Sequence, residues 1–142
     1  MGFLDDKIIE YDFTAYAVYQ EEDSRSVPTN AMYFNVTTVQ NIGGHTSNAH
    51  VIGVKEFYKP VLQGSITLPS SIDEKTISFV GNFKGANKIE NVYFLENNAY
   101  CGITDGGFFS EDCSSLLTNV YLPKTDNFTY IGYNAFANCL KL

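Results

Sequence analysis

The sequence predicts a mainly β fold, in which a short stack of about three repeat units follows a small β-rich N-terminal part. The 142-residue chain is rich in residues that favour strands, including ten Tyr and eleven Phe. Apolar residues recur in its second half at intervals of 26 to 28 positions, which is a spacing typical of stacked repeats. In its first half apolar and polar residues alternate, which is the period of a strand with one buried face.

Residues 1–60 are predicted to form either a β cap on the repeats or a small β domain of their own. The expected strands are residues 7–19, 32–39 and 50–58, and the expected loops are residues 20–26 and 43–48. The third strand is interrupted by Gly53. The cap is the favoured alternative, because sixty residues bury only a thin independent core. The junction with the repeats is expected at Lys59-Pro60.

Residues 61–142 contain four apolar columns that recur in the same order. The columns consist of Ile66, Val92 and Val120; Ile77, Ile103 and Ile131; Phe83, Phe109 and Phe136; and Ile89, Leu116 and Leu142. A single unit of this size cannot bury its apolar side chains alone, so successive units are expected to stack around a shared core. The first column opens an apolar-x-apolar pattern that predicts a short strand, and Pro123 is expected to end the last of these strands.

The last unit carries a more specific pattern. It consists of Val120-Tyr121-Leu122-Pro123, Ile131-Gly132, Ala135-Phe136, Cys139 and Leu142. With these residues the chain resembles the BspA-type leucine-rich repeat over roughly residues 60 to 142. The two preceding units match less closely, because Cys113 lies one residue late and Ala86 stands where the first unit would have its Cys.

The resemblance implies a curved leucine-rich-repeat solenoid with a non-catalytic role in binding. Proteins of this type are typically bacterial surface or secreted proteins that adhere to host or microbial partners, and some are found in protists. The resemblance therefore implies an extracellular or cell-surface location. It also implies a protein or glycan ligand, including ligands on a host's extracellular surfaces.

The candidate binding face consists of outward residues of the repeat strands, Asn91, Tyr93, Asn119 and Tyr121. Successive side chains of a strand point to opposite faces, so the neighbours of a core residue point away from the core. Tyr combines a large contact area with a polar tip and little rotamer entropy, which suits protein or glycan recognition. Two alternatives stay open, namely a structural spacer without a ligand and an accessory domain of a larger enzyme.

The composition argues against several other functions. A net charge of −7 with nine scattered Lys and Arg residues does not provide the clustered cations that bind nucleic acid or an anionic membrane surface. No apolar run reaches the length of a membrane helix. The chain lacks the common catalytic and phosphate-binding motifs, so it is not predicted to be an enzyme or to carry a cofactor.

No metal site is predicted either. His45 and His50 are the only histidines, and they are expected to be solvated loop residues because a metal site needs three or four supported ligands. Asp105-Gly106-Gly107 is expected to be a turn rather than a calcium loop, because the regular carboxylate spacing of such a loop is absent.

The cysteines and the chain ends complete the prediction. Cys113 and Cys139 occupy about the same position in adjacent units and are expected to pack as small apolar residues, with a disulfide as the lesser alternative. Cys101 lies on no column.

The N-terminal residues lack the pattern of a secretion signal. Leu142 falls on a core column, which predicts further repeats downstream of a truncated gene model, because the last repeat of a solenoid needs a polar cap.

Overall fold

The computed structural model describes residues 29–142, apart from residues 43, 45–46 and 96–98. Within that part the chain forms strands and two short 3₁₀ helices, with no α-helix. The elements are η1 (Ala31–Tyr33), β1 (Phe34–Val39), β2 (Ala49–Val54), η2 (Glu56–Tyr58), β3 (Gly64–Leu68), β4 (Ser71–Ile72), β5 (Lys75–Thr76), β6 (Phe79–Val80), β7 (Ile89–Phe94), β8 (Gly102–Ile103), β9 (Asn119–Tyr121) and β10 (Tyr130–Ile131). The strand expected at residues 7–19 and the loop expected at 20–26 lie outside the described residues.

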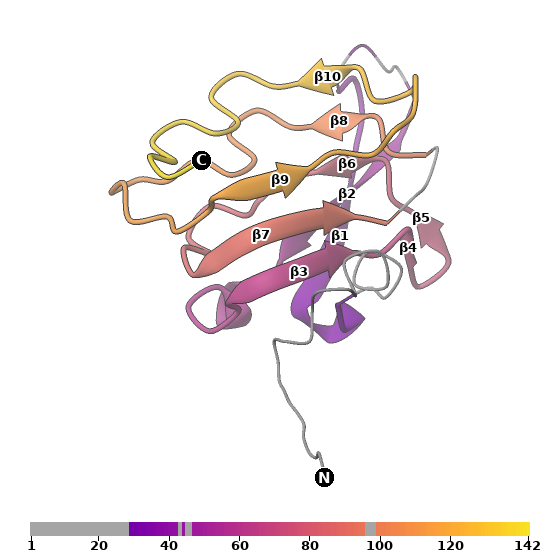
Figure 1. Ribbon diagram of the computed structural model, residues 1–142. Coiled ribbons are helices and arrows are strands. Elements are labelled where there is room, and N and C mark those ends of the chain that lie inside the picture. The colour runs from indigo at the N-terminus through magenta and orange to yellow at the C-terminus, as the bar shows by residue number, and fades with distance from the viewer. Residues whose placement is uncertain (1–28, 43, 45–46, 96–98) are drawn as a thin grey trace, which may run out of the picture.

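The repeat strands form two sheets that face each other (Figure 1). One sheet has the order β3-β7-β9, and the other has the order β1-β2-β6-β8-β10. From β3 onward the chain alternates between the two sheets, so each unit contributes one parallel strand to each. The short hairpin of β4 and β5 projects at one side, between β3 and β6 in the sequence. The predicted mainly β fold is confirmed.

The N-terminal hairpin is continuous with the larger sheet. β1 pairs antiparallel with β2 along its whole length, and β2 pairs parallel with β6 through Val51↔Phe79 and Ile52↔Val80. Phe34 on β1 and Ile52 on β2 belong to the same buried cluster as the side chains of the repeats. The hairpin therefore provides the first layer on which the repeat units stack.

The two expected strands of this part are found with changed ends. The strand predicted at 32–39 begins at Phe34, because the preceding residues form η1. The strand predicted at 50–58 ends at Val54, and Glu56–Tyr58 form η2 instead. Gly53 does not interrupt β2. A Cβ at Gly53 would lie 2.9 Å from the Cβ of Asn82, so glycine is needed where the next unit approaches the strand.

The first apolar column is confirmed in register. Ile66 on β3 pairs with Val92 on β7, and Val92 pairs with Val120 on β9. Ile66 and Val92 are buried, and Val120 packs against the same cluster at the end of the stack. Successive side chains of a strand point to opposite faces, which explains why these three residues share one side of the sheet.

The second column differs from the prediction in its first unit. Ile52, Val80, Ile103 and Ile131 are paired with one another in successive strands of the larger sheet. Val80 therefore holds the position that the spacing assigned to Ile77. Ile77 is buried in the same core, but it lies before β6 and outside the strand pairing.

The aromatic column passes through Phe108 and not through Phe109. The ring centroid of Phe108 lies 4.8 Å from that of Phe83 and 5.3 Å from that of Phe136, and the last two rings are parallel to within 8°. Phe34 extends the column into the N-terminal hairpin, with its centroid 6.3 Å from that of Phe83. The prediction of an aromatic column is right, but its middle member is off by one residue.

The fourth column is also off by one residue in its middle member. The pairing of Asn91 with Asn119 places Ile89 opposite Leu117, and both of these side chains are buried. Leu116, which the spacing indicated, is directed away from the core and exposed. Leu142 is 50 % exposed.

The glycines that follow Val80 and Ile131 of the second column are required by close packing between layers. A Cβ at Gly132 would overlap the backbone and carboxylate of Asp105, and a Cβ at Gly81 would overlap the side chain of Thr104. The apolar-Gly pair of the last unit therefore marks a position where adjacent layers approach too closely for a side chain.

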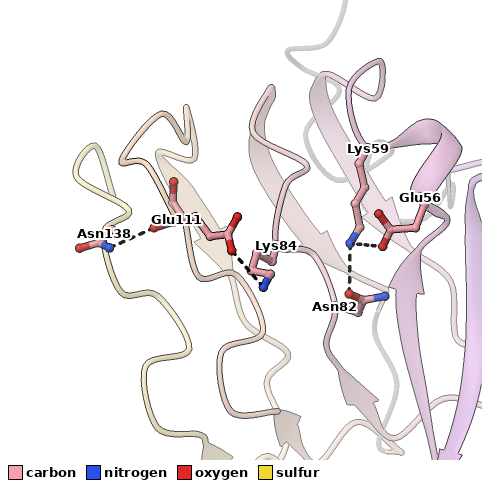
Figure 2. Close-up of polar contacts among 7 residues, drawn as sticks. Glu56, Lys59, Asn82, Lys84, Glu111 and Asn138 are labelled. Atoms are coloured by element: carbon pink, nitrogen blue, oxygen red, sulfur yellow. Dashed lines mark hydrogen bonds and ion pairs between the residues drawn. The ribbon is translucent and has the colours of Figure 1, made fainter.

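Polar contacts also link the turns of successive units (Figure 2). They are Lys59 Nζ to Glu56 Oε2 (2.8 Å) and Asn82 Oδ1 (3.1 Å), Lys84 Nζ to Glu111 Oε2 (3.4 Å), and Asn138 Nδ2 to the Ser110 carbonyl (3.0 Å). The Lys59 side chain is buried although it carries a charge. Its two oxygen partners compensate for the lost hydration of the ammonium, and the bond to Asn82 ties the segment after β2 to the first repeat unit.

Candidate binding face

Strand alternation places the four predicted residues on one face of the three-stranded sheet. Val92 and Phe94 of β7 point into the core. Asn91 and Tyr93 therefore point the other way, and the paired residues of β9 do the same. The structure brings the predicted residues together as two parallel rows, and we call this surface the β3-β7-β9 face.

The first row is polar. It consists of Ser65, Asn91 and Asn119, which are paired across β3, β7 and β9. Asn119 Nδ2 donates to Asn91 Oδ1 at 2.8 Å, and Asn91 Nδ2 donates to Ser65 Oγ at 3.0 Å. Because Asn91 accepts from Asn119 and donates to Ser65, the side chains of the row are held in one direction across the sheet.

The second row is aromatic and lies two residues further along each strand. Thr67, Tyr93 and Tyr121 are paired across the same strands. The rings of Tyr93 and Tyr121 are stacked, with centroids 4.6 Å apart and planes within 3° of parallel. This separation matches the spacing of neighbouring strands, about 4.8 Å. The two rings therefore stack across neighbouring strands, and each ring covers one face of the other.

Sequence reasoning did not include Ser65 and Thr67 in the face. Both belong to β3, the first strand of the sheet. The signal was present, because Ile66 was recognised as a core residue of a strand, and its two neighbours must point away from the core. Ser65 is exposed, whereas Thr67 is only 5 % exposed. Thr67 is also bonded to the chain before β1: its N–H donates to Thr29 Oγ1, and its carbonyl accepts from the Thr29 N–H, both at 2.8 Å.

A second group of polar side chains gathers around Asp105. The Asp105 carboxylate accepts from the Tyr130 hydroxyl at 2.7 Å and from the Tyr133 N–H at 2.8 Å. The Tyr130 hydroxyl, followed by the Tyr133 N–H, holds the pKa of Asp105 below its ordinary value. The pKa of Tyr130 is raised by its bond to the Asp105 carboxylate. This group joins the second unit to the third, as expected for a structural turn.

The residues considered for metal binding have structural roles where they are described. Within the described part of the chain, no group of three His, Cys, Asp or Glu side chains is placed to hold a metal ion. His50 lies on β2 rather than in a loop, with Nδ1 3.3 Å from Thr38 Oγ1. Asp112 accepts from the backbone N–H and the hydroxyl of Ser114, which hold its pKa below the ordinary value. His45 lies outside the described residues.

The three cysteines differ in their surroundings and are all free thiols. Cys139 is buried, and its thiol donates to the Phe108 carbonyl at 3.1 Å, as expected for a small core residue. Cys113 is exposed and has a φ of +63°, so the prediction that it packs in the same column is wrong. Cys101 is partly buried beside the cluster of Ala49, Val51 and Phe79, and burial raises the pKa of its thiol.

No helix among the described residues has the length and apolarity needed to cross a membrane.

Comparison with known proteins gives one structural likeness. No protein-family model matches the chain, and no curated protein matches it. A crystal structure of a leucine-rich-repeat protein from T. pallidum is similar to it, with a TM-score of 0.59 and 22% sequence identity. The match covers 82% of this chain and 48% of the T. pallidum chain, so this chain spans about half the length of that protein. The chain therefore has a leucine-rich-repeat fold.

Proposed function

We propose that the chain is a non-catalytic protein-binding module that recognises its partner through the β3-β7-β9 face. The observation that carries the proposal is the side-by-side arrangement of an amide row and a tyrosine row on one sheet. Amide groups provide directional hydrogen bonds, and tyrosines provide contact area with a polar tip. Both rows are held by their own contacts, so little side-chain entropy is lost when a partner binds.

The tyrosine geometry favours a protein over a glycan as the ligand. A sugar ring stacks its C–H face on the open face of an aromatic ring. Tyr93 and Tyr121 each use one ring face for the other, which leaves a sugar at most one face of each ring. A ligand at this sheet meets aromatic rings and hydroxyl groups beside amides, which suits the mixed apolar and polar surface of a protein.

A binding screen with matched variants tests this proposal. The chain is titrated against a panel of matrix proteins, mucins and free glycans, and each protein that binds is measured again with a Tyr93→Ala and Tyr121→Ala double variant. The double variant is expected to weaken binding tenfold or more, because two central tyrosines are lost at roughly 1 kcal/mol or more each. The Tyr→Phe variants keep the ring stack and lose only the hydroxyls. Their affinity is therefore expected to lie between that of the unchanged chain and that of the double Ala variant.

The matched control is Tyr133→Ala, because Tyr133 is exposed in the turn after β10 and not on this face. It is expected to leave the affinity unchanged. The double variant itself should remain folded, since both rings lie outside the core clusters and an aromatic pair contributes only about 0.5–1.5 kcal/mol beyond its buried area. Equal affinity of the double variant and the control would reject this face. Binding of glycans alone would reject the protein ligand.

We further propose that the module acts in adhesion at a cell surface or outside the cell. The support is the pattern of the last repeat unit, which resembles repeats of adhesive surface proteins. Immunofluorescence on intact, unpermeabilised cells of the source organism is expected to detect the protein. Detection only after permeabilisation would contradict this location without affecting the binding face.

A further inference from the structure

The outer edge of the larger sheet is formed by β1. Within the described residues, β1 pairs with β2 and with no other strand. On β2, the carbonyls of His50 and Ile52 accept from the N–H groups of Ser78 and Gly81, each at 2.9 Å, so their backbone groups point toward β6. In an extended strand the backbone groups of successive residues point to opposite sides. Val51, between these two residues, therefore points toward β1.

The direction of the Val51 backbone groups determines which N–H and carbonyl groups of β1 are not used by β2. Thr37 is paired with Val51, so its N–H and carbonyl face β2. Val36 and Thr38, its neighbours, must direct theirs to the opposite side, away from the sheet. The N–H and carbonyl groups of Val36 and Thr38 thus form a row of donors and acceptors along an open strand edge.

A groove lies beside this edge. Its volume is about 400 Å³, and it is lined by Ala31, Met32, Phe34, Asn35, Val36, Lys55, Ile72, Asp73 and Lys75. Three consecutive residues of β1 line it, although side chains of a strand alternate between faces. The groove therefore meets β1 along its backbone edge. Ile72, Asp73 and Lys75 of the β4-β5 hairpin also line the groove.

In the part of the chain that the structure describes, β1 also lacks the features by which proteins protect a sheet edge. Such edges are shortened, covered, or provided with charged residues or proline. β10 and β9 have only two and three residues, and β3 is bonded to Thr29. β1 has six residues, Phe-Asn-Val-Thr-Thr-Val, with no charge and no proline. It is the longest edge of the described sheets and the least protected.

We propose that β1 accepts an extended, acidic segment of a partner protein as an additional strand. Backbone hydrogen bonds to Val36 and Thr38 provide the affinity. Alternate side chains of the segment enter the groove between Phe34 and Ile72. Lys55 and Lys75 are exposed at the groove and outnumber its one carboxylate, that of Asp73, so carboxylates on the segment complement the net positive charge. This site lies on the larger sheet and is independent of the β3-β7-β9 face.

Amide hydrogen exchange of the full chain tests the geometry and the binding together. In the free protein, the Val36 and Thr38 amides are expected to exchange much faster than those of Asn35 and Thr37, which face β2. The probe is a synthetic peptide of about nine residues, which is one strand length, with Val alternating with Glu and Thr. Saturating peptide is expected to slow exchange at Val36 and Thr38 at least tenfold.

Two matched pairs identify the interactions. The first is the same peptide with alternate backbone nitrogens methylated, which cannot pair as a strand and is expected not to bind. The second compares Val36→Pro with Val36→Thr. Proline removes an N–H that β2 does not use, so the dissociation constant is expected to rise about fivefold or more, whereas threonine keeps the donor. Circular dichroism and the thermal midpoint check that both variants fold.

The charge contribution has its own control. A Lys55→Glu and Lys75→Glu double variant is expected to weaken the peptide about tenfold, and Lys124→Glu, in the loop between β9 and β10, is expected to have no effect. Absence of peptide binding at millimolar concentration, or protection at strands other than β1, would overturn the proposal. So would protection of Val36 that grows with protein concentration alone, which would mean that a second copy of the chain occupies the edge.

Discussion

Asp105 shows how a single polar residue connects two repeat units. Its exposed carboxylate accepts bonds from the side chain of Tyr130 and the backbone of Tyr133, both in the following unit. Gly132 makes this possible, because any side chain there would overlap Asp105. A turn that looked like a calcium-loop fragment in the sequence is therefore a hydrogen-bonded junction between layers.

The Asp105 junction is expected to make stability sensitive to acid. Because the pKa of Asp105 is lowered in the folded state, its contribution is complete above the unfolded value, near pH 4, and is lost as the pH falls through the folded value. Urea unfolding at a series of pH values below 5 should show that the free energy of unfolding falls less steeply with pH for Asp105→Asn than for the unchanged chain. Tyr130→Phe removes the largest cause of the lowered Asp105 pKa, so its free energy of unfolding should also fall less steeply. Identical slopes for all three proteins would contradict this role of the carboxylate.

The aromatic column runs through every layer of the described structure. Its rings come from the N-terminal hairpin and from each of the three units, and neighbouring centroids are 4.8 to 6.3 Å apart. The spacing of the repeats selected Phe109 for the second unit, whereas the structure places its neighbour Phe108 in the column. The strand spacing could not separate them, because the loop between strand and ring differs in length among the units. Val80 and Phe83 are three residues apart, whereas Ile103 and Phe108 are five apart.

Alanine substitutions at Phe108 and Phe109 should therefore lower the free energy of unfolding by different amounts. Phe108→Ala leaves a cavity between two rings of the column, and it is expected to lower the free energy of unfolding by about 3–5 kcal/mol. Phe109→Ala removes a side chain that is partly exposed and is expected to cost clearly less. Phe136→Ala is expected to lie between them, since that ring is in the column but only half buried. Chemical denaturation of the three variants checks the order, and equal losses for Phe108 and Phe109 would contradict the assigned column.

At the scale of the whole molecule, burial decreases toward the last layer. Val80 and Ile103 have neighbours on both sides and are fully buried, whereas the equivalent Ile131 is 52 % exposed. Stacked units stabilise one another mainly through nearest neighbours. The layer with one neighbour is therefore expected to open more often than the layers between two neighbours.

Hydrogen exchange at three equivalent amides measures this gradient. Gly81, Thr104 and Gly132 donate to the carbonyls of the preceding layer at Ile52, Val80 and Ile103, at 2.9, 2.8 and 2.9 Å. Their bonds are alike in length, so differences in exchange report the opening of layers rather than the quality of the bond. Gly132 is expected to exchange fastest after correction for intrinsic rates. Uniform exchange would mean that the layers open as one cooperative unit.

Sequence reasoning succeeded where the strand itself carried the signal. Ile66, Val92 and Val120 were aligned correctly, because the same apolar-x-apolar alternation marks the strand in each unit. The predicted face, with Asn91, Tyr93, Asn119 and Tyr121, then follows from alternation, because a residue beside a core position must point outward. The features predictable from the chain were thus those set by local geometry: mainly β structure, repetition, and which side chains share a side of a strand.

The remaining features depend on contacts between segments that are distant in the sequence. Loop lengths differ between units, so only the hydrogen-bond register decides between Phe108 and Phe109, or between Leu116 and Leu117. The continuity of β2 with β6, the stacking of Tyr93 on Tyr121, and the open edge of β1 arise from which strand lies beside which. Pairing energy comes from backbone groups that every residue carries, so the identity of a neighbouring strand is not encoded in any local pattern of side chains.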